Sequence, residues 1–543
     1  MERRKNVENR ECEFNLLDEP WIKVMKGDGT IDEVSLTTVF EQAHLYTDLA
    51  GELATQNVAV LRLLLAVLHT VFSRVDEHGE EAPIEKTDHA LNRWRELWNA
   101  NSFPIEPIKA YLHTQHEKFW MFHPERPFGQ VLSAAKGTPY SVSKLIGELS
   151  ESSNRICFFS SRMGKNKTEI SYAEAARWLL YINGFDDNSS KPKGKNLPSP
   201  GAGWLGKLGL ITAKGKTLFE TLMLNLVFLK EDHGPWKPNV PAWELPKARE
   251  GERIEITIPD NPAALLTLQS RRLLLERKNH KVAGYRLLGG DFFSRENAFN
   301  ETMTVWKPIM EKGKNTGKYQ PKRHDSSKQM WRDFASIVEQ NDTKHLPGIV
   351  TWLNYLQNKK YLSQHQILCF SIASVQYKDS DYCAIDEFSD SLSFYVGLLT
   401  EAGDILRNLA LDEISKCDDV ADMVGRLAED LVKAAGGRQG EAVKLRAKSE
   451  FYFRLDIPFR KWLSSLDPSK ESVEGKMAVQ KQWRTIIKEV AQSLGEELVE
   501  NAGTAAFVGR MVTEKIKGKE VTNHYCAPEV YNKFSYYLKE SLK

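Results

Sequence analysis

The residue pattern in this chain that comes nearest to a phosphate-binding loop is incomplete. Residues 213–217 read AKGKT, but the motif G-x-x-x-x-G-K-[ST] needs a glycine at position 210, where the chain has Leu210. Gly209 is one residue too far away, and that shift would change the ring of backbone N–H groups around a phosphate. We therefore expect no site for nucleotide hydrolysis.

The candidate metal ligands are also incomplete. His113 and His116 are three residues apart, but no third ligand accompanies them in an H-E-x-x-H arrangement. A carboxylate cluster that could in principle hold Mg²⁺ for a nuclease comprises Asp379, Asp381, Asp386, Glu387 and Asp390. Its spacing matches no dedicated metal loop, so we interpret it as a charged turn and predict no metal and no cofactor.

Positive charge is concentrated in the window 271–328, which holds 14 Lys or Arg and 6 Asp or Glu. Aromatic residues are interleaved with these cations, and that combination suits phosphate contacts with base stacking. The alternative is a solvated face covered by long side chains. The candidate phosphate contacts in this window and in a glycine-containing basic loop before it are Lys312, Lys314, Lys318, Lys191, Lys193 and Lys195.

Local patterns predict the elements that carry these residues. Ser171 and Glu174 form a capping box in front of an apolar helical face that stops near Gly184. The next segment, 186–203, reads DDNSSKPKGKNLPSPGAG and has almost no apolar residues. Such a composition predicts a long exposed loop, and loops of this length in a folded domain are usually functional or disordered.

The composition pattern changes near Phe394. Strand-like and helical segments alternate before it, which predicts a mixed α+β body over residues 1–392. Helical spacing dominates after it, and Asp467 with Pro468 has the pattern of an N-cap followed by the first residue of a long helix. The predicted fold class is therefore α+β, with an antiparallel four-helix bundle over residues 393–543.

Overall composition excludes some functions. The 543 residues include 74 Lys or Arg and 73 Asp or Glu, so the chain is neither a uniformly basic DNA coat nor an acidic disordered tail. The six cysteines are scattered without a C-x-x-C pair, which fits a reducing cytosol and excludes the common zinc-ribbon signature. The charged beginning of the chain lacks the apolar core of a signal peptide, and we expect a cytoplasmic protein without a membrane span.

Several segments together are distinctive. They are FNLLDEPWIKV at 14–24, DLAGELATQNVAVLRLLL at 48–65, FHPERPFGQ at 122–130, SYAEAARWLL at 171–180, PAWE at 241–244 and LQSRRL at 268–273. The set resembles the CasA family, the large subunit of the type I-E CRISPR surveillance complex Cascade, over most of the chain. The resemblance implies a subunit that is not itself an enzyme.

The resemblance also implies a set of partners. They are a CRISPR RNA, double-stranded target DNA, the other Cascade subunits (backbone, small and handle-binding) and a CRISPR helicase–nuclease. The implied function is to recognise the protospacer-adjacent motif (PAM) in duplex DNA, help start and stabilise the R-loop, and provide the docking site for the helicase–nuclease. Guide pairing then reads the long sequence, and the protein reads only a short duplex element.

Four sites follow from the resemblance. A loop that contacts the guide RNA and neighbouring subunits falls on Phe158, Phe159, Ser160, Arg162, Gly164 and Lys165. A glycine loop that reads the PAM from the minor groove matches Gly201, Ala202 and Gly203. A turn that wedges into the duplex beside the PAM matches Lys378, Asp379, Ser380 and Asp381. The candidates for a further PAM-contacting cation are Lys281 and Arg286. We expect the glycine loop and the turn to meet in space.

The chain departs from some family members at two places. Where those members have a cysteine-rich zinc site, this chain has residues 278–284 without a cysteine, so we predict no zinc. Where some have Asn and Gln in the wedge, this chain has Asp379 and Asp381. Two other functions are alternatives: a metal-dependent nuclease or NTPase acting on nucleic acid, and a pure scaffold whose basic loops contact only protein and RNA.

The incomplete motifs lead to the first prediction. The isolated chain, incubated with ATP or labelled DNA and Mg²⁺, Mn²⁺ or Ni²⁺, should hydrolyse neither substrate, because no complete phosphate loop or metal-ligand set is present. Product formation followed by thin-layer chromatography and gel electrophoresis checks this. Turnover that disappears in Lys216→Ala or Asp379→Ala would establish an enzyme.

Overall fold

The structure is a computed structural model. It describes residues 12–151, 156–157, 160, 162–192, 194–246, 251, 253–339, 344–438, 440–470, 473–516 and 519–543. The chain forms two compact units. The first comprises Met1–Ser327, Glu339–Tyr361 and Leu368–Ser391, and the second comprises Lys328–Val338, Leu362–Ile367 and Leu392–Lys543. Two short segments from before residue 392 thus belong to the second unit. Helices and strands are both abundant, and the predicted α+β class is confirmed.

The first unit begins with a small antiparallel sheet of order β3-β2-β4, formed by β2 (Ile22–Lys26), β3 (Ile31–Val34) and β4 (Tyr46–Leu49). The long apolar helix α3 (Ala54–Phe72) follows it. This helix is long and apolar enough to cross a membrane, but 94% of its most apolar window is buried inside the protein. It is therefore the central core helix of this unit.

The predicted capping box is present at the start of α7 (Tyr172–Phe185), where Ser171 Oγ accepts a hydrogen bond from the Glu174 N–H at 3.1 Å. Helix α7 packs against α3 and against a sheet of order β6-β10-β9. The strands of this sheet are β6 (Thr138–Ser141), β10 (Lys281–Gly289) and β9 (Arg271–Lys278). The loop 186–203 leaves the end of α7 beside this sheet.

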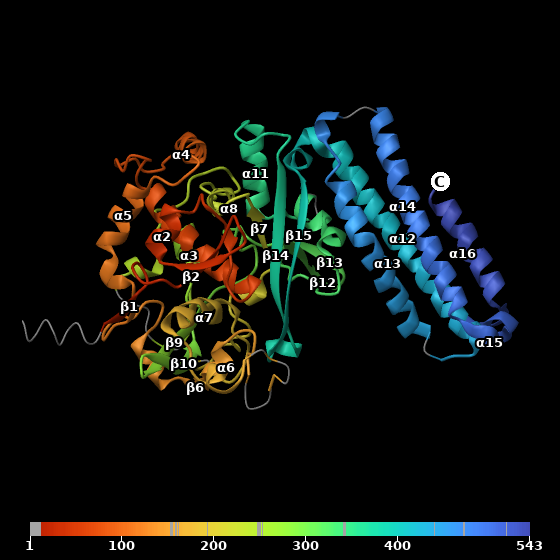
Figure 1. Ribbon diagram of the computed structural model, residues 1–543, viewed down its shortest axis with the longest axis horizontal. Coiled ribbons are helices and arrows are strands. Elements are labelled where there is room, and N and C mark those ends of the chain that lie inside the picture. Colours follow the sequence, from red (N-terminus) through yellow and green to blue (C-terminus); the bar gives the residue numbers. More distant parts are fainter. Residues whose placement is uncertain are drawn as a thin grey trace, which may run out of the picture. The chain divides into compact units, whose positions relative to one another are not determined.

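A third sheet of the first unit has the order β15-β14-β7. Strand β14 (Ile367–Tyr377) pairs antiparallel with β7 (Leu210–Lys214), with Ile372 opposite Ile211. Strands β14 and β15 (Ala384–Tyr395) form the long hairpin in Figure 1, with the turn 378–383 at its tip. The hairpin carries this turn away from the sheet toward the segment around α6 (Val142–Leu145).

The remaining elements connect and cover these layers. The helices are α2 (Leu36–Glu41), α4 (Thr87–Asn99), α5 (Ile105–Thr114), α8 (Leu218–Asn225), α9 (Pro262–Leu266), α10 (Ala335–Val338) and α11 (Gly348–Asn358). The strands are β1 (Glu13–Asn15), β5 (Trp120–Phe122), β8 (Ile254–Glu255), β11 (Asp291–Phe292), β12 (Trp306–Glu311) and β13 (Lys314–Pro321). Of all these elements, α10 belongs to the second unit.

The second unit has four long helices among its described residues: α12 (Asp404–Ala435), α13 (Gly440–Leu463), α14 (Val473–Glu500) and α16 (Ala527–Ser541). Aromatic side chains form much of its core. Trp462 stacks on Trp483 with ring centroids 5.3 Å apart, and Phe459 stacks on Trp331 at 4.4 Å. The predicted C-terminal helical region is present.

Residues 404–435 form one continuous helix. Two details of the second unit differ from the sequence-based expectation. The long helix expected to open at Pro468 begins at Val473, because Pro468–Lys470 forms a 3₁₀ turn in front of it. A hairpin of β16 (Arg510–Ile516) and β17 (Lys519–Tyr525), with the short helix α15 (Gly503–Val508) before it, stands between the last two long helices and was not expected.

The core of the first unit contains a buried ion pair. Arg62, on α3, donates from Nη1 and Nη2 to the two carboxylate oxygens of Glu301 at 2.8 and 2.9 Å. The Trp204 indole N–H also donates to Glu301, at 2.8 Å, and both charged side chains are almost completely buried. Glu301 therefore links the core helix α3, through Arg62, to Trp204, the residue that follows the glycine loop.

The second prediction concerns this pair. Arg62→Met should lower the free energy of unfolding of the first unit by about 3–5 kcal/mol, because it leaves the Glu301 carboxylate buried without its cation. Urea denaturation followed by circular dichroism measures the loss. The control is Lys318→Met, which removes an exposed pair with Glu296 and should not move the urea midpoint. Equal shifts for the two variants would contradict this account of the core.

Candidate nucleic-acid interface

The turn at the tip of the β14–β15 hairpin has an unusual backbone. Ser380 and Asp381 both have left-handed conformations, with φ of 59° and 58°. For residues other than glycine such a conformation costs roughly 1–2 kcal/mol each and persists where surrounding contacts impose it. Lys378, Asp379 and Ser380 are exposed, and the Lys378 N–H donates to the Cys383 carbonyl at 2.9 Å, which closes the turn.

Asp381 connects this turn to the glycine loop. Its Oδ2 accepts a hydrogen bond from the Ala202 N–H at 3.1 Å, and its Oδ1 accepts one from Arg323 Nη1 at 2.6 Å. Arg323 also donates to the Gly206 carbonyl at 2.6 Å and lies over the ring of Tyr377, 5.0 Å from its centroid. Burial raises the pKa of Asp381, but Arg323 and the Ala202 N–H outweigh burial and hold that pKa below its usual value.

Asn188 holds the same two segments together from the loop that follows α7. Its N–H donates to the Asp381 carbonyl at 2.7 Å, and its Nδ2 donates to the Ser380 carbonyl at 3.1 Å. Its side-chain oxygen accepts from the Gly201 N–H at 3.1 Å and from the Ser199 hydroxyl at 2.8 Å. The structure thus brings the glycine loop and the turn together, and one asparagine contacts both.

The two glycines of the loop have different surroundings. Gly201 is partly exposed and has φ +61°, and a Cβ there would lie 3.3 Å from Asp381 Oδ2. Gly203 is buried, and a Cβ there would lie 2.3 Å from the Gly184 carbonyl oxygen. Ala202 is also buried. Gly203 therefore permits close packing on the end of α7, and Gly201 is the member of the loop whose main chain is accessible.

A buried charge cluster lies beneath the glycine loop. Asp186 pairs with Arg271 at 2.5 Å and with Lys191 at 2.9 Å, and Asp187 pairs with Lys144 at 2.5 Å. The two flanking cations lower the pKa of Asp186 despite its burial, and burial lowers the pKa of Lys191 to about 8. Lys191, predicted to contact phosphate, is thus an internal counterion whose exposed fraction is 9%.

Arg271 connects this cluster to the loop. Its Nη2 donates to the Gly201 carbonyl at 2.6 Å and to the Asp186 carbonyl at 3.2 Å, and the Gly203 N–H donates to the Asp186 carbonyl at 2.8 Å. The conformation of the glycine loop is therefore set by buried electrostatic contacts as well as by the turn beside it.

The predicted guide-RNA loop is partly described. Arg162 forms ion pairs with Glu148 and, at 2.6 Å, with Glu174, and its N–H donates to Ser160 Oγ at 3.0 Å. Gly164 and Lys165 are exposed on the 3₁₀ turn Gly164–Lys167. Phe158 and Phe159 lie outside the described residues, as does Lys193. Lys195 is exposed.

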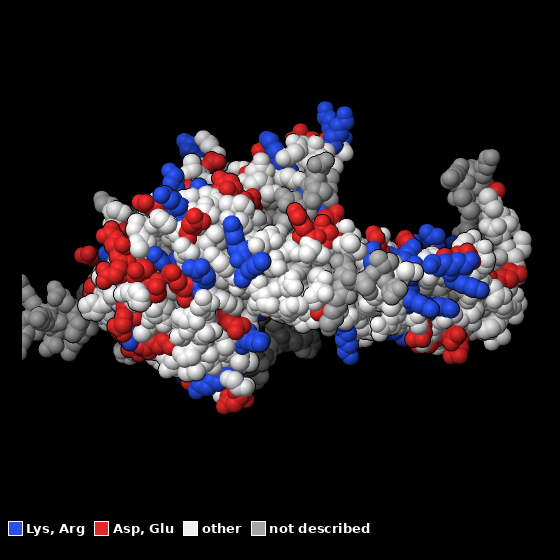
Figure 2. Space-filling model, turned by 90° about the horizontal axis from the view of Figure 1, so that it is seen from above, with Lys and Arg blue, Asp and Glu red and all other residues white. Residues whose placement is uncertain are grey.

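Other predicted cations differ in how they are paired. On β10, Lys281 pairs with Glu169 at 3.4 Å and Arg286 pairs with Glu276 at 2.8 Å. Lys318 pairs with Glu296 at 2.7 Å. The described contacts include no ion pair for the exposed Lys312, Lys314 or Lys378. Figure 2 shows basic and acidic side chains side by side over the described part of one face, in agreement with a net charge of +1.

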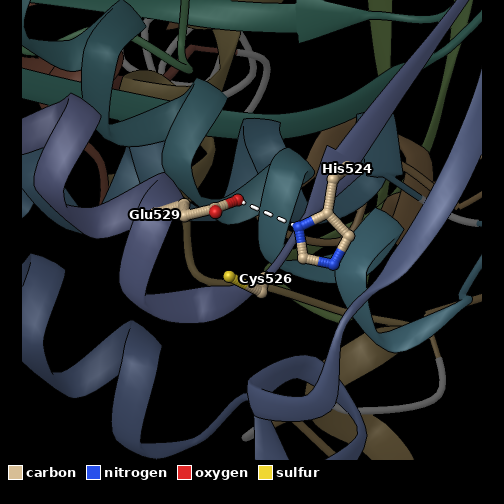
Figure 3. Close-up of side chains that lie close together, drawn as sticks. All are labelled: His524, Cys526 and Glu529. Carbon is tan, nitrogen blue, oxygen red and sulfur yellow. Dashed lines mark hydrogen bonds and ion pairs between the residues drawn. The ribbon is translucent and has the colours of Figure 1, made fainter.

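A cluster of metal-ligand types lies in the second unit, where β17 leads into α16 (Figure 3). One ligand atom from each of His524, Cys526 and Glu529 lies within 4.8 Å of the others. His524 Nδ1 is 3.0 Å from Glu529 Oε2, and Cys526 is the N-cap residue of α16. The three donors have types that zinc accepts. The sequence did not indicate them as ligands because their spacing matches no established metal-binding motif. Without any metal, the contact between His524 and Glu529 links the β16–β17 hairpin to α16.

The third prediction concerns Asn188. Asn188→Ala should remove the three hydrogen bonds of its side chain, to Ser380, Gly201 and Ser199. The amide hydrogens of Gly201, Ala202 and Asp381 should then exchange with solvent about tenfold faster or more, because the loop and the turn lose their shared partner. Hydrogen exchange with mass spectrometry or NMR detection measures this.

The matched control for this variant is Asn358→Ala, which removes an exposed asparagine bonded to Asn354 and should leave these amides unchanged. Equal exchange in all three proteins would show that the Asn188 side chain does not hold the segments together.

Comparison with known proteins identifies the family. The family model of CRISPR-associated protein Cse1 matches residues 15–494. A CRISPR-associated protein CasA/Cse1 from Thermus thermophilus is 30% identical over 342 residues, which are 61% of this chain and 61% of that protein.

Solved structures agree with this match. Cse1 from Thermobifida fusca is 29% identical, with a TM-score of 0.80 over 98% of both chains. A chain of a CRISPR RNA-guided surveillance complex has the same fold at 15% identity, with a TM-score of 0.68 over 97% of this chain and 99% of that chain. Because the family model covers most of the sequence, this chain belongs to the Cse1 family of CRISPR-associated proteins.

Proposed function

We propose that this protein is the large subunit of a type I-E Cascade complex and that it recognises the PAM in double-stranded DNA. Membership of the Cse1 family supports the assignment to such a complex. The observation that carries the PAM-reading role is the contact between the glycine loop and the hairpin turn through Asn188 and Asp381. A duplex reader needs an accessible main-chain segment and a strand-separating element at fixed spacing. We assign these two parts to the glycine loop and the turn, and the contacts between them fix their spacing.

The glycine loop suits minor-groove reading. The minor groove is about 6 Å wide, so main chain without a side chain can approach base edges that a Cβ would keep at a distance. Gly201 is accessible, and its carbonyl and N–H are already held by Arg271 and Asn188, so little ordering remains to be done on binding. Minor-groove patterns distinguish A·T from G·C but little else, and we therefore expect several PAM sequences to be accepted.

The turn suits strand opening. Opening a base pair costs a few kcal/mol of stacking and pairing, and an inserted element together with guide pairing must offset that cost. The turn 378–382 projects from a hairpin and is fixed at Asp381 and at the carbonyl of Ser380, so it can occupy the position of the first base pair beyond the PAM. Lys378 at its edge can neutralise a phosphate of either strand.

Other parts of the chain have proposed contacts as well. The loop at 160–167 contacts the guide RNA and a neighbouring subunit, and Lys312 with Lys314 at the β12–β13 hairpin contributes sequence-independent phosphate attraction. The helical second unit meets another subunit and takes part in stabilising the R-loop, and the assembled complex then presents the docking site for the helicase–nuclease. In these roles the chain binds and positions nucleic acid and does not cleave it.

The fourth prediction tests the glycine loop in the complex assembled with this chain. Gly201→Asp should weaken binding to a PAM-bearing duplex at least about fivefold, because a carboxylate about 4 Å from a phosphate costs roughly 1 kcal/mol or more. A target whose strands are mismatched and already open should bind with nearly unchanged affinity. Binding to both targets is measured by gel shift or interferometry, with the PAM first selected by the wild-type complex from a randomised flank.

The matched control is Gly29→Asp, at a glycine that also has a positive φ, of +83°, but has no atom within 4 Å of its Cβ position. It carries the same backbone strain and the same added charge away from the loop, and it should keep the wild-type preference for PAM-bearing duplex. Equal losses by Gly201→Asp on paired and open targets would show that the loop does not read the duplex. Wild-type binding without any PAM preference would favour the scaffold function.

A further inference from the structure

A small pocket lies directly beneath the glycine loop and is distinct from the loop–turn contact. It has a volume of about 20 Å³, and its lining includes Pro200, Ala202, Lys207, Arg253, Phe292 and Phe293. A space of this size holds about one water molecule, or one oxygen of a phosphate group whose remaining atoms stay outside. The full lining combines the cations Lys207, Arg253 and Arg271, the aromatic rings of Trp204, Phe292 and Phe293, and the carboxylate of Asp291.

Two of the cations at this pocket, Lys207 and Arg253, are partly buried. Lys207 Nζ is 4.0 Å from the position that a Cβ of Gly201 would take, and it donates one described hydrogen bond, to the Pro200 carbonyl at 3.1 Å. The Arg253 guanidinium lies over the Phe292 ring, 4.0 Å from its centroid, and donates to the Pro198 carbonyl. Both contacts orient the cations without neutralising them.

Most carboxylates near the pocket already have partners, and the exposed Glu255 acts on Arg253 more weakly than burial and Arg271 do. Asp291 pairs with Arg272 at 2.5 Å, Asp381 pairs with Arg323 at 2.6 Å, and Asp186 is held by Arg271 and Lys191. Among the described residues, no ion pair to a carboxylate occurs for Lys207, Arg253 or the exposed Arg295. The site therefore has an excess of positive charge.

The excess charge acts on Lys207 itself. The pKa of Lys207 is lowered to about 7, first by burial and then by the nearby charges of Arg271, Arg295 and Arg253. Those three cations lie close enough to Lys207 to disfavour its protonated form, and Asp381 opposes them only weakly. An anion bound between Lys207 and Arg253 would relieve this repulsion, whereas a neutral ligand would not.

We propose that this pocket binds one backbone phosphate of the DNA duplex whose minor groove faces Gly201. The inference rests on the proposed function and adds a phosphate anchor to it. Phosphate contacts carry no sequence information, but they fix the register of a protein on the duplex. Lys207 and Arg253 would thus set which base step lies against Gly201, and the planar guanidinium group of Arg253 suits a phosphate in particular.

The test uses the assembled complex and PAM-bearing duplexes in which single phosphates across the PAM and its flanking steps are replaced by neutral methylphosphonates. Wild type should lose about tenfold in affinity at one position more than at its neighbours, as expected for a charged hydrogen bond. Arg253→Ala should weaken binding to the unmodified duplex, and the methylphosphonate at that position should then cause little additional loss.

Lys207→Met, at a half-buried position, is added only if the variant melts like wild type, and Arg253→Ala keeps the test decisive without it. Lys312→Ala is the control: it removes an exposed cation outside the pocket lining, lowers the salt dependence of binding, and should retain the position-specific loss. Methylphosphonate profiles that are identical in wild type and Arg253→Ala would overturn the anchor.

A DNA-independent arm separates this inference from the proposed function. Sulfate, compared with chloride at equal ionic strength, should raise the melting temperature of the wild-type chain more than that of Arg253→Ala. PAM preference with unchanged methylphosphonate profiles would leave the function standing and reject the anchor. Sulfate stabilisation without any PAM preference in wild type would reject the function and, with it, the assignment of DNA as the ligand.

Discussion

The neutralisation of Asp186 is the constraint on which the proposed interface depends. This carboxylate lies fully buried where α7 ends, and a buried carboxylate requires cations and hydrogen bonds to remain charged. Arg271 comes to it from the first residue of β9, and Lys191 comes from the loop that follows α7. The requirement therefore joins a helix end, a strand start and a long polar loop, and it brings Arg271 within reach of the Gly201 carbonyl.

The same constraint explains why local charge was an incomplete guide to binding. The window 271–328 is rich in cations, but Arg271 and Arg272 at its start are buried and paired with Asp186 and Asp291. A count of charged residues does not show that these arginines and carboxylates pair, because only the fold brings each carboxylate next to its arginine. A net charge over a window cannot distinguish an internal counterion from a cation that faces solvent.

Much of the local structure could be predicted from the sequence. Ser171 and Glu174 indicated the start of α7, and the low apolar content of 186–203 indicated an irregular segment. These signals are local, since capping and composition depend on residues a few positions apart. The predicted exposure of that segment is wrong at Asp186, Asp187 and Lys191, which are buried because they pair with one another or with other charged side chains. The hairpin β16–β17 was missed because its pairing depends on packing within the second unit.

In the candidate site, the glycine loop and the turn suggested by the family resemblance are brought together, but the residues that hold them were not predicted. Asn188 and Arg323 lie in polar segments with no periodic pattern, and nothing in their spacing indicates Asp381 as a partner. Gly203 was expected to face a groove, and it instead allows the loop to pack on Gly184. Residue types suggested an interface, and its geometry depends on long-range contacts.

The left-handed turn divides the hairpin tip into a constrained part and an adaptable part. Asp381 is tied by its side chain and main chain, and the carbonyl of Ser380 is tied to Asn188, so these contacts set the backbone path. The side chains of Lys378 and Asp379 are exposed and can vary without unfolding the turn. A library randomised at 378 and 379 with Asn188, Arg323 and Asp381 retained would therefore sample new tip chemistries on a constant scaffold, a practical starting point for engineering the target range of such a complex.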